Sequence, residues 1–212
     1  EESVSFISKA YFEIARTYSK EKKFSEALEN YNCCLGLQLN LFSKLSESRN
    51  SDIFSSYLKV AKNFKKLHKY SDALVYYQEA LKLFGLLQNK PLTIKLKIIR
   101  QIAKFLFKKK RYGEARVQLD SAKQILEINK DILAKLKLKY LDIKLSKIEG
   151  GDLTQVPSDF LVEDGDDDYY LSYEERYIRG KILFTIGEYD SALTQFNVCY
   201  NMCKDGSGGE RN

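Results

Sequence analysis

The chain has 212 residues, with 35 Lys and Arg against 29 Asp and Glu, and a formal net charge of +6. Hydrophobic residues make up 44% of it, which excludes a wholly disordered chain. Only two prolines occur, and Lys, Leu, Glu and Ala are abundant, so we expect helices throughout. No stretch approaches the roughly 20 apolar residues that cross a bilayer, so we expect no membrane segment.

The four cysteines, Cys33, Cys34, Cys199 and Cys203, are adjacent or four residues apart. Such spacing is typical neither of a disulfide framework nor of the CxxC motif of zinc sites, and His68 is the only histidine. We interpret the cysteines as small apolar side chains and expect no metal and no cofactor. The first residues show no signal-peptide pattern. The predicted location is therefore intracellular, cytoplasmic or nuclear.

One short phrase recurs along the chain: a charged residue, an aromatic residue, two small or polar residues, and Ala. Such a phrase is typical of a helical hairpin, in which the charged residue lies in the turn, the aromatic residue fills the junction, and Ser, Asp or Gly opens the second helix. The alanine allows the two helices to approach closely. The four phrases are Lys-Phe-Ser-Glu-Ala-Leu at 23–28, Lys-Tyr-Ser-Asp-Ala-Leu at 69–74, Arg-Tyr-Gly-Glu-Ala-Arg at 111–116 and Glu-Tyr-Asp-Ser-Ala-Leu at 188–193.

Residues on both sides of each phrase keep the same spacing. The first helices share one pattern, seen in Tyr11, Ile14, Ala15 and Tyr18, in Tyr57, Val60, Ala61 and Phe64, and in Ile99, Ile102, Ala103 and Leu106. The second helices place a large residue four positions after the alanine (Tyr31, Tyr77, Leu119 and Phe196) and a small one three further on (Cys34, Ala80, Ala122 and Cys199). The fourth unit departs, because Arg176 and Arg179 occupy positions expected to be apolar, although Gly180 and Leu183 fit.

These phrases and spacings resemble the tetratricopeptide-repeat family, whose helical hairpins carry small and aromatic residues at such positions. The resemblance implies an all-α fold, a right-handed superhelix of antiparallel hairpins, and a scaffold or adaptor that binds other proteins. The alanines Ala27, Ala73 and Ala115 are 46 and 42 residues apart, against about 34 in the standard repeat. Lengthened repeats of this kind are similar to those of kinesin light chains and Pins-type spindle-orientation adaptors.

In chain order, we expect one repeat domain over 1–204 and a flexible tail or linker over 205–212. The interval from Ala115 to Ala192 is 77 residues, close to two periods, so it contains a degenerate repeat whose first helix is Ile132 to Ile148. Gly150 and Gly151 end that helix, and a further helix resumes near Tyr169 or Tyr170. The predicted repeats lie near 3–41, 50–87, 91–128, 131–168 (with an acidic loop at 150–168) and 169–204.

Charged residues are unevenly distributed along the chain. Between Lys90 and Lys147, seventeen Lys and Arg and five Asp and Glu give a net charge of +12, whereas Ile148 to Glu175 contains ten acids and no base. Three roles of the acidic loop stay open: a solvated insertion, a plug lying on a basic groove of the same chain, or a docking site for a basic partner.

The resemblance implies that the first helices line a concave groove, so their outward positions are the candidate partner-binding residues. A basic groove with apolar sockets suits an acidic partner segment with hydrophobic anchors. Some tetratricopeptide domains bind chaperone tails through a carboxylate clamp whose first-repeat pair is Lys and Asn. The equivalent residues here are Phe12 and Arg16, which argues against chaperone-tail binding. The candidate residues are Lys9, Phe12, Arg16, Leu58, Lys62, Lys65, Lys97, Arg100, Lys104 and Lys108.

The sequence offers no catalytic candidates, because phosphate-binding glycine loops, HExxH and GxSxG motifs are absent. We expect no enzyme, and His68 is interpreted as a surface turn residue. Two alternatives to a peptide-binding scaffold remain: a nucleic-acid-binding surface on the basic stretch, disfavoured because no base-reading module is visible, and a structural solenoid segment of a larger complex.

Overall fold

The computed structural model describes residues 2–40, 47–88, 90–128, 131–151, 153 and 172–208. Within these ranges the chain is all-α, and no strand occurs, which confirms the predicted fold class. The predicted acidic loop at 150–168 falls mainly outside the described residues. The chain divides into two compact units, Glu1–Arg111 and Tyr112–Asn212, and the boundary falls inside the third predicted repeat.

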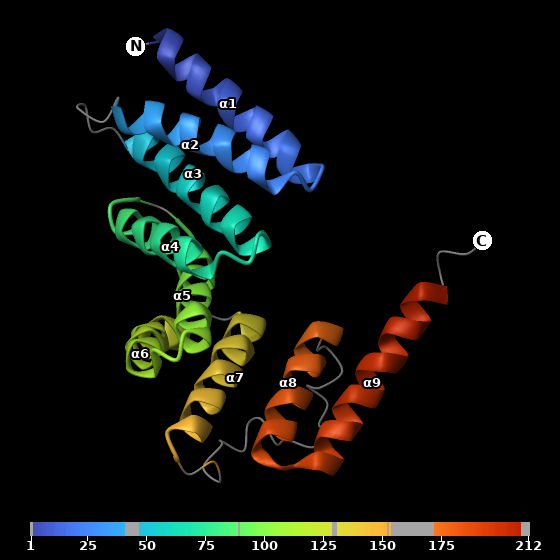
Figure 1. Ribbon diagram of the computed structural model, residues 1–212. Helices are drawn as coiled ribbons and strands as arrows, with labels where there is room; N and C mark the ends of the chain where they lie inside the picture. The colour runs from blue at the N-terminus through green and yellow to red at the C-terminus, as the bar shows by residue number, and fades with distance from the viewer. Residues whose placement is uncertain are drawn as a thin grey trace. The chain divides into compact units, whose positions relative to one another are not determined.

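The first unit contains five consecutive helices, each of which packs against the next. Figure 1 shows α1 to α4 as neighbouring antiparallel rods, the arrangement expected of stacked helical hairpins. The predicted pairs at 3–41 and 50–87 therefore form as hairpins. The bounds are α1 Glu2–Lys20, α2 Phe24–Asn40, α3 Glu47–Lys66, α4 Tyr70–Phe84 and α5 Leu92–Lys108.

The second unit contains four described helices, again packed in chain order. The first helix of the degenerate repeat forms over the predicted residues, and Gly150 follows it with φ +74°. The final helix continues to Gly208, into the segment predicted as a tail. The bounds are α6 Tyr112–Ile128, α7 Ile132–Ile148, α8 Tyr173–Ile186 and α9 Tyr189–Gly208.

The small residues of the repeat pattern are buried where helices cross. Ala15, Ala61, Ala73 and Ala103 each have 0% of their surface exposed. Cys34 takes the place of such an alanine and is also fully buried, with its Sγ 3.7 Å from Ser56 Oγ. In the last hairpin, Gly180 occupies the position equivalent to Ala61. A Cβ at Gly180 would lie 2.6 Å from the ring of Phe196, so only glycine fits there. Close helix contact thus explains the repeated small residues.

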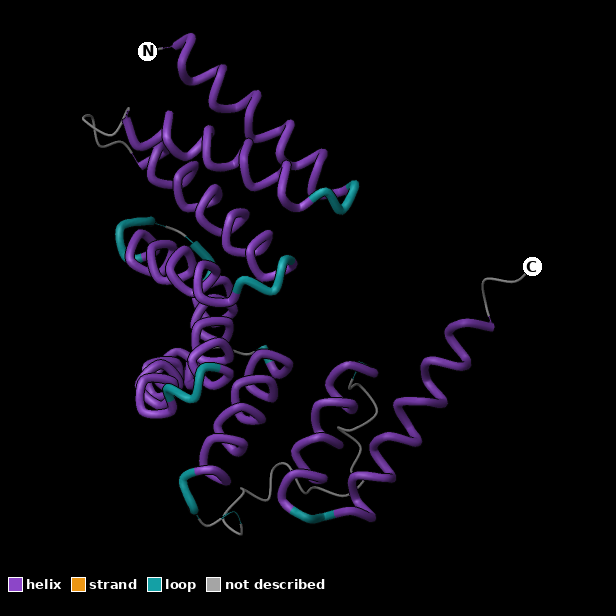
Figure 2. Tube along the Cα trace, in the orientation of Figure 1, coloured by secondary structure: helices purple, strands orange, loops and turns teal. Residues whose placement is uncertain are grey.

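The turns after α1, α3, α5 and α8 share one backbone geometry, and Figure 2 draws them as short loops. The residue two positions before each aromatic has a left-handed conformation, with φ of 64° at Lys22, 60° at His68, 60° at Lys110 and 99° at Gly187. The next backbone N–H donates to the carbonyl five residues earlier, as from Lys69 to Phe64 (2.9 Å). This is a Schellman-type helix end, which usually has glycine at the left-handed position.

The aromatic residue of each phrase begins the second helix, one residue earlier than predicted. At α4 the residue before it, Lys69, makes no side-chain capping hydrogen bond. The backbone bond of the turn, rather than a Ser or Asp cap, therefore defines the start of this helix.

Candidate partner-binding cleft

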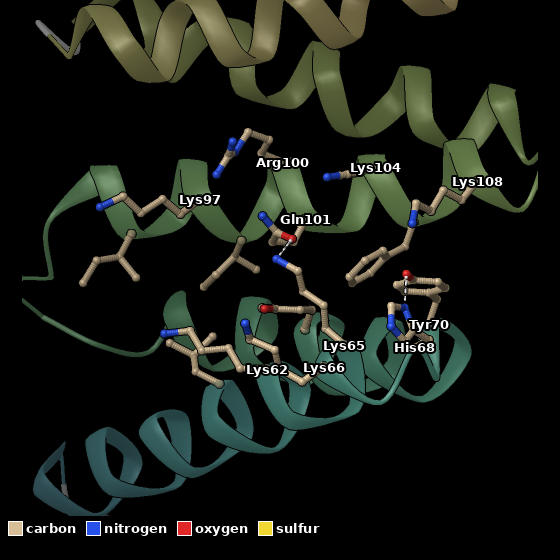
Figure 3. Close-up of a pocket in the computed structure, with 15 residues that line it drawn as sticks. Lys62, Lys65, Lys66, His68, Tyr70, Lys97, Arg100, Gln101, Lys104 and Lys108 are labelled. Atoms are coloured by element: carbon tan, nitrogen blue, oxygen red, sulfur yellow. Dashed lines mark hydrogen bonds between the residues drawn. The ribbon is translucent and has the colours of Figure 1, made fainter. Parts of the chain in front are cut away.

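A cleft of about 880 Å³ opens in the first unit, between α3 and α5, with α4 contributing to its lining. Seven of the ten candidate residues line it, and Figure 3 shows Lys65 of α3 reaching toward Gln101 of α5. Its size lies within the range of sites that hold a small ligand or a short peptide segment. The seven are Leu58, Lys62, Lys65, Lys97, Arg100, Lys104 and Lys108.

Helical periodicity brings these side chains together. On α3 the lining residues recur at intervals of three or four, and on α5 they follow the same spacing, so each helix presents one face. The α3 face consists of Leu58, Lys62, Lys65 and Lys66, and the α5 face of Ile94, Lys97, Ile98, Arg100, Gln101, Lys104, Phe105 and Lys108.

An aromatic group closes one end of the cleft. The rings of Tyr70 and Tyr77, both on α4, lie 5.4 and 5.9 Å from the ring of Phe105 on α5. Lys108 Nζ lies 3.9 Å from the centre of the Tyr70 ring, a cation–π contact, and His68 Nδ1 is 2.8 Å from the Tyr70 hydroxyl. His68 is an exposed turn residue, as predicted, and also borders the cleft.

The rim of the cleft is cationic. Seven Lys and Arg are among the fifteen lining residues, and no Asp or Glu is. Lys62, Lys66 and Lys97 make no ion pair with any residue that the structure describes. A positive field of this kind attracts anionic partners.

Lys65 lies at the centre of this charge and is only partly exposed. Its Nζ donates a hydrogen bond of 3.0 Å to Oε1 of Gln101 (Figure 3). Burial lowers the pKa of Lys65 below the usual 10.5, and the nearby cations of α5 and α3 lower it further. These cations are Lys104, Arg100, Lys66 and Lys62.

Burial also raises the pKa of Tyr77 to about 12, while Arg100 opposes the shift. Tyr77 is 3% exposed, so its ring belongs to the floor of the cleft rather than to the rim. Together the lining offers cations above an apolar floor, which suits an anionic group attached to apolar neighbours.

The three candidate residues on α1 do not line the cleft. Arg16 pairs with Glu13 at 3.2 Å on its own helix, and Lys9 Nζ lies 5.6 Å from the ring of Phe6. Phe12 packs into the core formed with Tyr31, at 5.4 Å between ring centres. The structure therefore separates these residues from the other seven.

Several lining residues were not predicted from the sequence, chiefly Lys66, Tyr70, Gln101 and Phe105. Gln101 and Lys66 adjoin predicted residues on the same helices, and a wider helical face would have included them. Tyr70 was interpreted only as a packing residue of its repeat phrase. Its second role depends on Phe105 and Lys108, which are distant in sequence.

The described residues contain no group of three or more His, Cys, Asp and Glu placed to hold a metal ion. In the same residues, no helix is both long and apolar enough to cross a membrane.

Comparison with known proteins gives no assignment: no protein-family model matches the chain, and no curated protein sequence matches it. The likeness to tetratricopeptide repeats therefore depends on the repeated phrases, their spacing and the hairpins that they form.

Proposed function

We propose that this chain is a tetratricopeptide-type scaffold or adaptor whose first unit binds an acidic segment of a partner protein, with hydrophobic anchors, in the cleft between α3 and α5. The observation that carries the proposal is the seven cations around an apolar floor, with no acid among the lining residues. A fold by itself does not define a function, whereas the chemistry of this lining selects the kind of partner.

The cationic and the apolar lining residues contribute to binding in different ways. The cations speed association and select acidic segments, because they lie around the opening where a partner first meets the surface. The apolar floor, which includes Leu58 and Ile94, accepts the anchors. The proposed setting is intracellular, cytoplasmic or nuclear, which agrees with four free cysteines.

The test is a binding assay on short peptides that combine Asp and Glu with Leu, Ile or Phe, compared with basic and neutral peptides. The triple variant Lys97→Glu, Arg100→Glu, Lys104→Glu removes the cationic face of α5. We expect it to lose about 100-fold in affinity for the acidic peptides, because it replaces attraction by repulsion at three neighbouring positions that line the cleft.

The matched control is Lys9→Glu, Arg16→Glu, Lys82→Glu, which makes the same change in net charge at residues outside the cleft. We expect less than about fivefold loss, since exposed charges contribute little. An equal loss in both variants would overturn the proposed site. A random oligonucleotide that binds more tightly than the acidic peptides, with a steep salt dependence, would favour a nucleic-acid-binding surface instead.

A further inference from the structure

The positive charges clustered around Lys65 indicate a site for an anionic ligand. Seven cations and no acid line the cleft, and Lys65 within it donates its hydrogen bond of 3.0 Å to an uncharged oxygen, that of Gln101. Four of these cations lower the pKa of Lys65. Clustered like charges at a half-buried position reduce stability. Such locally unfavourable arrangements mark binding sites, because the ligand removes the repulsion.

The density of the cations favours phosphate over carboxylate as the bound anion. An extended segment presents one side chain every second residue to the same surface, about 7 Å apart, so few carboxylates reach a single lysine. A phosphorylated side chain carries a charge of about −1.5 to −2 and three acceptor oxygens on one group. One phosphoryl group therefore brings more negative charge and more acceptor oxygens to Lys65 and its cationic neighbours than one carboxylate does.

The apolar residues beside the cations favour a peptide over a small polyphosphate. Leu58 of α3 and Ile94 and Ile98 of α5 line the same cleft as the lysines. Tyr70, packed on the buried ring of Phe105, adds aromatic surface at the other end. A highly charged small molecule has no apolar groups to pack against these residues, whereas a peptide supplies apolar side chains next to its phosphorylated residue.

We propose that the partner segment held between α3 and α5 carries a phosphorylated serine, threonine or tyrosine, whose phosphoryl group binds at Lys65 among Lys62, Lys66, Arg100 and Lys104. Phosphorylation of the partner then switches the interaction from weak to tight. This inference rests on the proposed function, because it specifies the chemistry of the segment that the same cleft binds.

The experiment uses individual peptides of mixed acidic and apolar composition, each synthesised with Ser, Glu or phosphoserine at one central position. Matched sets with Thr and phosphothreonine, and with Tyr and phosphotyrosine, complete the comparison. Binding to the full chain is measured by fluorescence anisotropy. We expect the phosphorylated form to bind about 30-fold more tightly than the Ser form, and the Glu form to gain only a few-fold, because charge-assisted bonds to phosphate are stronger and more numerous.

The possible results separate the two proposals. If the acidic peptides bind but phosphorylation of none of the three residue types improves affinity, the phosphate inference is wrong and the proposed function stands. If no peptide binds in any form, the proposed function itself fails. If inositol hexakisphosphate binds more tightly than every phosphopeptide, the ligand is a small polyphosphate and the inference is overturned.

The substitution Lys65→Met tests where the phosphoryl group binds. We expect it to reduce the advantage of the phosphorylated peptide from about 30-fold to less than about fivefold, while the affinity for the Ser form changes little. Lys65→Arg keeps the charge and should retain most of the advantage. Lys82→Met, on the exposed surface of α4, should leave both affinities unchanged. An undiminished advantage in Lys65→Met, with thermal unfolding like that of the unchanged protein, would place the phosphate elsewhere and overturn the inference.

Discussion

Two neighbouring faces of the first unit start from the same repeat pattern and end with different chemistry. On α1, Arg16 is paired with Glu13, and Phe12 is covered by Tyr31. On α5, the equivalent face joins α3 around a cationic cleft with no acidic lining residue. A repeat position therefore defines where a side chain lies, whereas neighbouring residues determine whether its charge is available to a partner.

Lys59 and Lys65, both on α3, show the same contrast within one helix. Burial lowers the pKa of each, and nearby cations lower it further. Glu13 acts in the opposite direction on Lys59, whereas the four charged neighbours that affect Lys65 are all cations. A single acid on α1 therefore distinguishes the two environments.

Among the variants that test this comparison, the largest effect is expected from placing an acid in the cleft. In Gln101→Glu, a carboxylate replaces the amide oxygen that lies 3.0 Å from Lys65 Nζ. We expect a loss of about tenfold in affinity for acidic peptides, because the added carboxylate repels their acidic groups as well as pairing with Lys65. The measurement is fluorescence anisotropy at low salt.

The reciprocal change, Glu13→Gln, removes the acid from the α1 face. We expect less than about twofold change in acidic-peptide affinity, since α1 residues do not line the cleft. A larger gain in Glu13→Gln than the loss in Gln101→Glu would show that the binding surface lies on α1 and α3 instead.

A smaller effect, on stability, is expected in the turns that follow α1 and α3, which share one backbone geometry. Lys22 and His68 both have positive φ, a conformation that costs non-glycine residues about 1 kcal/mol or more. Lys22→Gly and His68→Gly should each stabilise the protein by up to about 1 kcal/mol, measured by urea unfolding. Gly187→Ala, in the equivalent turn of the second unit, should destabilise it.

The two turns should differ in one respect. His68→Gly also removes the contact with the Tyr70 hydroxyl, so its gain should be the smaller of the two. A loss of stability in Lys22→Gly would contradict the argument from backbone strain.

The smallest expected effect concerns the repulsion at Lys65. Lys65→Met should raise the free energy of unfolding at pH 7 by about 1 kcal/mol or less, because it removes a partly buried charge among cations. Lys82→Met, which breaks an exposed pair with Glu79, should not stabilise.

The pH dependence has a definite sign. Because the pKa of Lys65 is lower in the folded protein than the usual 10.5, the unfolded chain binds more protons between these two values. The destabilisation is therefore fully present below the folded pKa and disappears as the pH rises toward 10.5. The difference between Lys65→Met and the unchanged protein should shrink over that interval, and a constant difference would exclude this cause.

Much of the fold was predictable because its determinants are local. The alanine spacing correctly predicted the buried small residues of α3 and α4, and the glycines after Ile148 correctly predicted the end of α7. The left-handed turns were not predicted, because Lys22 and His68 lack the glycine that usually signals them. The geometry there is enforced by the helices on both sides rather than by the turn residue.

The candidate site was predictable in position and not in extent. Helical periodicity identified the facing residues of α3 and α5, such as Lys65 and Lys104. It also selected Arg16, because the pattern contains no information on the ion pair with Glu13. Residues such as Tyr70 join the cleft through tertiary packing, which a single helix does not encode.

The shared turn geometry has a consequence for how such a scaffold can diversify. Because a main-chain bond such as that from Lys69 to Phe64 closes each connection, the side chain at the left-handed position contributes little to holding the helices together. His68 already uses this freedom to reach Tyr70 at the cleft. Each hairpin thus provides one replaceable position at its tip, where a new recognition group can be added without disturbing the framework.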